Sequence, residues 1–171
     1  GLEENTILIF ASDHGEMNGD AGLIYKENFL DGAVRVPMIV STPDTARGSA
    51  GGRVEETFVE WFDAGPTLVE LAEQKPHIGQ DARSLAPVLT GANTNPRDHC
   101  VSEYRHEIML MNDRWKVAVN SELDPYLLFD RIEDPGETVN LAGEKECSAV
   151  LSELTEKLRE ELPDAGISTS K

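Results

Sequence analysis

Apolar residues near the start of the chain form continuous runs of strand length. The run Thr6–Ala11 is rich in β-branched and aromatic residues, which predicts a strand buried on both faces inside an α/β sheet. A second strand is expected over Val34–Val40, with Pro37 at its beginning or edge, where a proline is tolerated. A helical pattern follows in which Asp63 is expected to cap the first turn, and a short helix is expected over Ser84–Leu89.

The pattern changes after about residue 97 to short strand candidates separated by turns. These candidates are Cys100–Tyr104, Ile108–Met111, Trp115–Val119 and Leu127–Phe129, with a hairpin turn between the second and the third. Leucines and a valine at helical spacing over residues 150–162 predict a one-faced amphipathic helix. The predicted fold class is α/β: residues 1–95 form part of an α/β sheet domain, and residues 96–171 form a small α+β domain with an antiparallel sheet and a C-terminal packing helix.

Charge and composition narrow the expected partners. The formal net charge of -17 repels phosphate backbones, so no nucleic-acid partner is expected. No apolar run is long enough to cross a membrane. Cys100 and Cys147 allow one disulfide or none, and the sequence does not decide between the two. The chain runs from Gly1–Asn5 directly into a strand, as a segment cut from a larger protein would, and without a secretory signal the compartment stays open.

Polar side chains cluster where the first predicted strand ends, at Asp13, His14 and Gly15. Open α/β sheets bind ligands outside the carboxyl ends of their strands. A carboxylate and a neutral imidazole both suit a divalent cation, and a glycine lets the backbone approach a ligand closely. Lys26 follows in a glycine-punctuated loop, where its ammonium is a candidate contact for an anion. Taken one by one, the same residues also fit an Asp-capped turn, a surface histidine and a solvated lysine.

Further motifs follow these in order and cover about residues 5–162. The ordered segments are Asn5–Glu16, Gly19–Asp20, Gly22–Leu23, Lys26, Gly32–Pro37, Asp63–Leu68, Ser102–Glu103, Trp115–Lys116, Leu128–Asp130, Asp134–Pro135, Glu137 and Asn140–Leu141. Their sequence and spacing resemble the sulfatase family of the alkaline-phosphatase-like superfamily. The ordered set is far more specific than any single motif.

The resemblance implies roles for four residues of this chain. Asp13 and His14 match the pair that coordinates the active-site metal, usually calcium, and some members have Asn at the position of His14. Lys26 matches the lysine that contacts the sulfate group. Arg35 matches an arginine expected to support the loop by pairing with an acidic neighbour. The family nucleophile is a formylglycine made from Cys or Ser: its hydrated aldehyde attacks sulfur, the alcohol leaves, and the sulfated hemiacetal collapses to release sulfate.

The sequence departs from the family pattern in two ways. Neither Cys100 nor Cys147 lies in the modification motif, so the nucleophile and half of the metal site are expected outside this chain, which alone is expected to be inactive. Ala21 stands where many relatives have His, which leaves the leaving-group contact and the substrate open.

The resemblance implies that the substrate is a small-molecule or carbohydrate sulfate ester. Two alternatives stay open: a phosphonate or phosphate ester hydrolase of the same superfamily, often with zinc, and a non-catalytic metal-binding module. Because neighbouring strands of the first sheet are expected to be missing, the isolated chain is also expected to self-associate through a sheet edge, or to rearrange.

Overall fold

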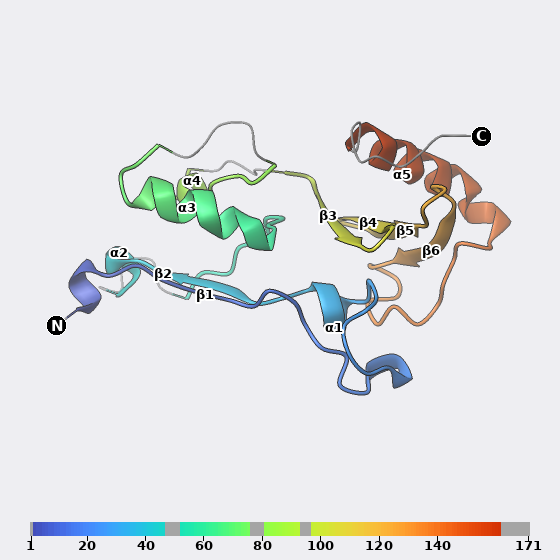
Figure 1. The fold of residues 1–171 in the computed structure, drawn as a ribbon, viewed down its shortest axis with the longest axis horizontal. Helices are drawn as coiled ribbons and strands as arrows, with labels where there is room; N and C mark the ends of the chain where they lie inside the picture. Colours follow the sequence, from blue (N-terminus) through green and yellow to red (C-terminus); the bar gives the residue numbers. More distant parts are fainter. Residues whose placement is uncertain (1, 47–51, 76–80, 93–96, 162–171) are drawn as a thin grey trace. The chain divides into compact units, whose positions relative to one another are not determined.

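The computed structural model describes residues 2–46, 52–75, 81–92 and 97–161 (Figure 1). It divides into two compact units. The first unit holds Gly1–Gly15 with Arg35–Asp98, and the second holds Glu16–Val34 with His99–Lys171. The boundary expected between residues 95 and 96 stays a prediction. None of the helices in these described ranges combines the length and apolar character needed to cross a membrane.

A two-stranded sheet forms the centre of the first unit. Strand β1 (Leu8–Ala11) pairs antiparallel with β2 (Met38–Ser41), and Phe10 lies opposite Ile39. The prediction that the first strand is buried on both faces is wrong for this chain, because Leu8 is 62% and Phe10 58% exposed. Among the described strands β1 pairs only with β2, and Ile39 of β2, opposite Phe10, is exposed as well, so this small sheet has one open face. The second strand starts after Pro37 as predicted, but Val34, where the strand was expected to begin, is the last residue of helix α1 (Asp31–Val34).

Short helices complete the first unit. The helical elements are the 3-10 helix η1 (Glu3–Asn5), α2 (Pro43–Ala46), the 3-10 helix η3 (Trp61–Asp63), α3 (Ala64–Leu71) and α4 (Ala86–Leu89). The two helices predicted from the apolar spacing are therefore confirmed as α3 and α4. The capping prediction for Asp63 is confirmed at the first turn of this helical segment, where its side chain forms a capping box with Glu60 at η3. At α3 itself Asp63 occupies the N-cap position, but its side chain makes no capping hydrogen bond. Its carboxylate turns back toward η3 and toward the chain that follows α3.

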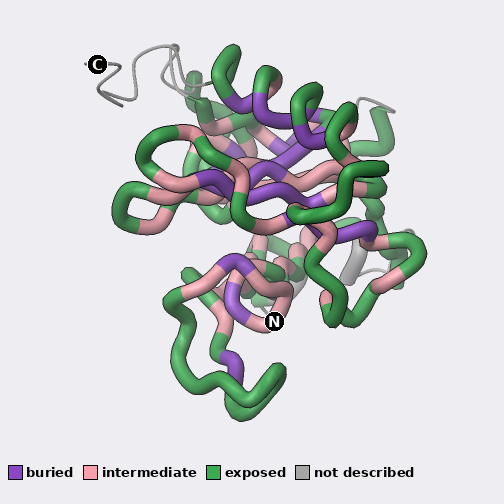
Figure 2. The backbone as a smooth tube through the Cα atoms, turned by 90° about the vertical axis from the view of Figure 1, so that its right-hand side faces the viewer, coloured by how far each residue is buried: buried purple, intermediate pink, exposed green. Residues whose placement is uncertain are grey.

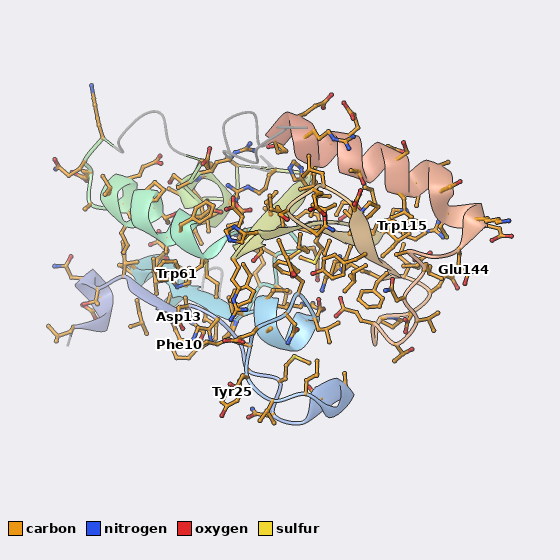
Figure 3. All side chains as sticks on the ribbon, turned by 45° about the vertical axis from the view of Figure 1, so that its right-hand side comes forward. Phe10, Asp13, Tyr25, Trp61, Trp115 and Glu144 are labelled. Carbon is orange, nitrogen blue, oxygen red and sulfur yellow. The ribbon has the colours of Figure 1, made fainter. Side chains whose placement is uncertain are left out.

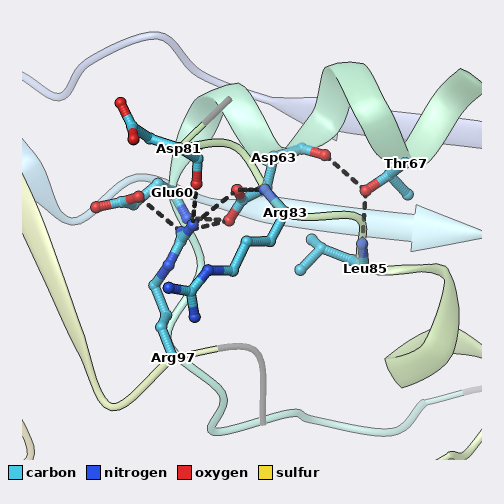
Figure 4. A network of polar contacts seen from close by, with 7 residues as sticks. All are labelled: Glu60, Asp63, Thr67, Asp81, Arg83, Leu85 and Arg97. Atoms are coloured by element: carbon cyan, nitrogen blue, oxygen red, sulfur yellow. Dashed lines mark hydrogen bonds and ion pairs between the residues drawn. The ribbon is translucent and has the colours of Figure 1, made fainter. Parts of the chain in front are cut away.

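The carboxylate of Asp63 is the centre of a buried polar network (Figure 4). It accepts hydrogen bonds from the backbone amides of Glu60 and Arg83, both at 2.8 Å. Arg97 adds two further hydrogen bonds from its guanidinium, at 2.6 and 3.1 Å. The hydroxyl of Thr67 donates to the carbonyl of Asp63 at 2.6 Å, one turn along α3. The network therefore ties η3 and α3 to the chain on either side of α4.

The second unit is built on an antiparallel sheet of four strands in the order β3-β4-β5-β6. The strands are β3 (His99–Tyr104), β4 (Glu107–Asn112), β5 (Trp115–Val119) and β6 (Pro125–Asp130). This confirms the predicted small sheet, including the tight β4–β5 hairpin, where the Asn112 side chain accepts from the amides of Arg114 and Trp115. The remaining elements are the 3-10 helices η2 (Asp20–Gly22) and η4 (Lys145–Cys147), α1 (Asp31–Val34) and α5 (Ser148–Glu161). Cys100 and Cys147 are free, so they form no disulfide.

The two faces of this sheet are covered by different parts of the chain. Side chains alternate along a strand, so Val117 and Ala118 of β5 point to opposite faces. On one face, Val117 joins a core with leucines of α5, which is confirmed as the predicted packing helix (Figure 1). On the other face, Ala118 and Met109 pack against Phe29, which belongs to the segment Glu16–Val34. Figure 2 shows buried backbone in both the strands and α5.

Candidate functional site

The first part of the candidate site follows β1 directly. Asp13 and His14 lie just past the end of this strand, where Figure 3 labels Asp13 beside Phe10. The backbone amide of His14 donates to Oδ1 of Asp13 at 3.0 Å. Nδ1 of His14 lies 2.8 Å from the carbonyl oxygen of Gly15. Since a carbonyl only accepts, Nδ1 is the donor of this hydrogen bond, and in the neutral form of this tautomer Nε2 is the acceptor nitrogen.

The pair fits a divalent cation as part of a ligand set. Nε2 of His14 and Oδ2 of Asp13 are 3.7 Å apart. Both atoms can contact one ion at that separation, because metal–nitrogen and metal–oxygen bonds are each about 2.0–2.6 Å long. The two side chains are 42% and 70% exposed, so they are accessible to ligands from outside the unit. Over the described ranges no group of three or more His, Cys, Asp or Glu side chains is placed to hold a metal ion.

Lys26, the predicted anion contact, belongs to the other unit. Lys26 is exposed in the loop between η2 and α1. The chain directly after this loop is anchored by Phe29, which is 2% exposed and packs on Met109 and Ala118. The long side chain of Lys26 is therefore presented to solvent from a loop whose far end is fixed to the sheet.

The remaining predicted residues, Arg35 and Ala21, are both exposed. Arg35 belongs to the first unit, with Asp13 and His14. Its supporting role stays a prediction. Ala21 lies inside η2 with a left-handed φ of 50°. The structure thus brings Asp13 and His14 together, whereas Lys26 lies in the unit that does not contain them.

A buried ion triad lies beside the Lys26 loop. Lys116 of β5 is fully buried, and its ammonium contacts Oδ1 of Asp31 at 2.5 Å and Oε1 of Glu137. Glu137 closes the triad through Oε2, which accepts the backbone amide of Asp31 at 2.7 Å. No hydrogen bond from another described residue reaches Oε1 of Glu137, so this buried oxygen depends on the lysine.

Burial and the lysine act in opposite directions on the two carboxyl groups. Burial raises the pKa of Glu137 above its ordinary value, and the hydrogen bond and charge of Lys116 only partly oppose this. Burial also acts to raise the pKa of Asp31, but the hydrogen bond and charge of Lys116 outweigh it and lower that pKa. The two carboxyl groups of the triad are therefore not equivalent.

The sequence patterns assigned no role to this triad. Lys116 and Glu137 belong to motifs that carried the family resemblance, and Asp31 was not singled out. One signal was present: Lys116 stands in a strand whose other residues are apolar, at a position that faces Phe129 on β6. A lysine at such a position needs a buried partner.

Comparison with known proteins gives a consistent assignment. The family model for N-sulphoglucosamine sulphohydrolase, C-terminal, matches residues 19–164. The choline-sulfatase of Rhizobium meliloti (strain 1021) is 36% identical over 151 residues, which cover 81% of this chain and 27% of that protein. The arylsulfatase of Clostridium perfringens (strain 13 / Type A) is 29% identical over 168 residues, which cover 95% and 34%.

A solved structure outside the named sulfatases is also similar. The phosphonate monoester hydrolase of Agrobacterium radiobacter superposes with a TM-score of 0.80 at 29% sequence identity, covering 92% of this chain and 35% of that one. The chain thus spans about a third of the length of these relatives.

Proposed function

Because the chain belongs to the sulfatase family of the alkaline-phosphatase-like superfamily, we propose that it is the C-terminal part of a hydrolase that cleaves sulfate esters. The match of residues 19–164 to a sulphohydrolase C-terminal model carries the proposal. The proposed substrate is a small-molecule or carbohydrate sulfate ester. The isolated chain is proposed to be inactive, since the nucleophile is proposed to be a formylglycine in the remainder of the longer protein.

Asp13 and His14 would supply two ligands to a divalent cation, for which calcium is proposed. When bound, such an ion withdraws charge from the sulfate oxygens as the ester bond breaks. The hydrogen bond between Nδ1 of His14 and Gly15 orients the imidazole so that Nε2 faces Asp13. This preorganisation supports the metal assignment, because an outer hydrogen bond of this kind fixes the tautomer of a ligating histidine.

Lys26 is proposed to bind the sulfate group. Its ammonium is a compact charge on a flexible stem, and it stabilises negative charge on a sulfate oxygen as the alcohol leaves. Its position in an exposed loop is compatible with this role.

A phosphonate or phosphate ester hydrolase is the second candidate. The phosphonate monoester hydrolase resembles this chain over 92% of its length, about as well as the named sulfatases do. Sulfate, phosphate and phosphonate groups all present oxyanions around a tetrahedral centre, so one lysine and one metal pair serve each of them.

The deciding experiment uses the longer protein that contains this chain. An aryl sulfate and an aryl phosphonate ester are assayed in parallel, and the nucleophile peptide is analysed by mass spectrometry. Sulfate release together with a formylglycine mass shift supports the first proposal. Phosphonate cleavage without sulfate release supports the second candidate and makes Lys26 a phosphonate contact, while the absence of both activities contradicts both.

A further inference from the structure

The loop that carries Lys26 has a defined backbone framework. The carbonyl of Tyr25 accepts from the amide of Met17 at 3.0 Å, and the carbonyl of Lys26 accepts from the amide of Asn28 at 2.8 Å. Met17 is 2% exposed and lies against α1, where a Cβ atom on Gly32 would come within 3.0 Å of its sulfur. The loop and α1 are therefore coupled, so a movement of α1 moves the backbone around Lys26.

An apolar contact and the ion triad join this framework to the sheet. Phe29 packs on Met109 and Ala118, and Lys116 lies on the same face of β5 as Ala118 because side chains alternate. Apolar packing is not directional and tolerates small displacements. The triad is directional, because Lys116 contacts the side chain of Asp31 while Glu137 accepts the amide of the same residue. The triad thus fixes the first residue of α1, Asp31, at a defined position against β5.

The triad is a costly way to fill this space. A fully buried lysine loses its hydration, and an apolar residue of similar length often stabilises a core as well or better. Glu137 also holds a left-handed φ of 53°, which is disfavoured for residues that carry a Cβ atom. The ion triad fixes the position of α1 relative to the turn that contains Glu137. A methionine at position 116 would fill the space without these directional contacts.

We propose that Lys116, together with Asp31 and Glu137, is a positioning residue that holds the Lys26 loop in place for binding the anionic group of the substrate. The proposal rests on the function proposed above for Lys26. Lys116 itself does not touch the substrate, since its side chain is fully buried in contact with Asp31 and Glu137. It acts through α1 and the backbone framework of the loop.

Hydrogen exchange in the 171-residue chain tests the physical part of the proposal. Lys116→Met is expected to accelerate exchange of the amides of Met17 and Asn28 by about tenfold or more, because their framework loses its anchor. The amides of α5, on the opposite face of the sheet, should keep their protection. Arg114→Met is the matched control: it removes a cation from the same hairpin, where it pairs with Asp130, and should leave the loop unchanged. Unchanged exchange around Lys26 in Lys116→Met would overturn the proposal.

A second variant covers the case in which Lys116→Met unfolds. Glu137→Gln keeps the shape of the side chain but has only one acceptor oxygen, because its nitrogen is a donor. The variant can therefore no longer use one oxygen for the amide of Asp31 and the other for Lys116. Faster exchange at the amides of Asp31 and Asn28, with α5 still protected, supports the proposal. Exchange as slow as in the unmodified chain contradicts it.

Kinetics in the longer hydrolase tests whether Lys116 acts through Lys26. Lys116→Met is expected to lower kcat/KM about 10–100-fold, the range expected for a displaced catalytic contact. In a Lys26→Ala background the same change should cost less than about threefold, because the contact it positions is already gone. Losses that multiply in the double variant would assign Lys116 a purely structural role and overturn the proposal.

The two proposals fail in different ways. If the unmodified longer protein hydrolyses neither the sulfate nor the phosphonate ester, the proposed function fails, and the exchange experiment still decides whether the triad holds the loop. If hydrolysis is observed but exchange around Lys26 does not respond to Lys116→Met, the triad proposal fails and the proposed function stands.

Discussion

The guanidinium of Arg97 donates two hydrogen bonds to the carboxylate of Asp63, at 2.6 and 3.1 Å, across 34 positions of the sequence. The Asp63 side chain is fully buried and that of Arg97 is 5% exposed. Glu60 also pairs with the same guanidinium, at 2.7 Å. Because buried charges are costly when unpaired, this arrangement makes the first unit sensitive to the loss of either partner.

Arg97→Met should lower the free energy of unfolding of the first unit by about 3–5 kcal/mol, because it leaves the Asp63 charge buried without its cation. Native-state hydrogen exchange of the α3 amides measures this unit separately from the other. Arg114→Met is the control, since the Arg114–Asp130 pair has one exposed partner that is screened by solvent. If Arg114→Met lowered the free energy of unfolding of the second unit as much as Arg97→Met lowers that of the first, burial of the Arg97–Asp63 pair would not be the cause of the loss.

The exposed face of β1 predicts self-association of the isolated chain. Leu8, Phe10 and Ile39 present a contiguous apolar surface, with exposed fractions of 62%, 58% and 61%. Sedimentation at high protein and high salt concentration should show dimers or larger species, because salt screens the repulsion between chains of net charge -17. Phe10→Lys should shift the chain toward monomer.

The control for this surface is Ile132→Lys, which changes an equally exposed residue, 61% accessible, in the other unit. It should leave the association unchanged. A strictly monomeric chain under all these conditions would show that β1 and β2 do not form an adhesive surface.

Divalent metal binding by the isolated chain should be weak, because Asp13 and His14 supply only two ligands where calcium takes six to eight oxygens. Calorimetry should give a dissociation constant of about 10⁻³ M or weaker, and Asp13→Ala should abolish the signal. His14→Asn should keep it, since an amide oxygen is also a calcium ligand. Tight calcium binding that survives Asp13→Ala would remove Asp13 from the site.

The turn after β6 predicts an acid-sensitive second unit. A hydrogen bond from the Val139 amide lowers the pKa of Asp134 below 3.8, and Thr138 adds to the effect. A folded-state pKa below the unfolded one stabilises the fold above the unfolded pKa, and the gain is lost as the pH falls through the folded pKa. Asp134→Asn should therefore flatten the decline in stability below about pH 4.

Urea titrations between pH 3 and 6, followed through Trp115, measure this dependence in the second unit. Asp113→Asn removes another negative charge and separates the effect of net charge from that of the hydrogen bonds. Glu137 works in the opposite direction, because its raised pKa contributes stability at low pH that is lost as the pH rises through that pKa. An unchanged slope in Asp134→Asn would show that its hydrogen bonds do not stabilise the folded state.

Local patterns predicted the second unit well. The short apolar runs of β4 and β5, the turn between them and the leucine spacing of α5 each follow from residues close together in the sequence, and the sheet and its core confirm them. The burial of β1 was predicted wrongly for a physical reason. A continuous apolar run is typical of a strand in the interior of a larger sheet. Among the described strands, β1 has only one neighbour.

Long-range polar contacts could not be derived from the sequence. Asp63 was expected to cap a helix because its local position fits that role. Its carboxylate also accepts hydrogen bonds from the amide of Arg83 and from the guanidinium of Arg97, 34 positions away, which no local pattern predicts. Lys116 and Glu137 were visible as motif residues, and their contact with Asp31 depends on how the segment before α1 folds back on the sheet. The candidate metal pair was predictable because Asp13 and His14 are adjacent in the sequence.

The most direct test of the proposed function is kcat/KM of the longer protein for an aryl sulfate, with and without Lys26→Ala. Removing a charge that stabilises the transition state should lower kcat/KM about 10²–10³-fold. Lys145→Ala, which changes an exposed lysine in η4, should leave it unchanged. Sulfate release by Lys26→Ala at the rate of the unmodified protein would contradict the assignment of Lys26 as the sulfate-binding residue.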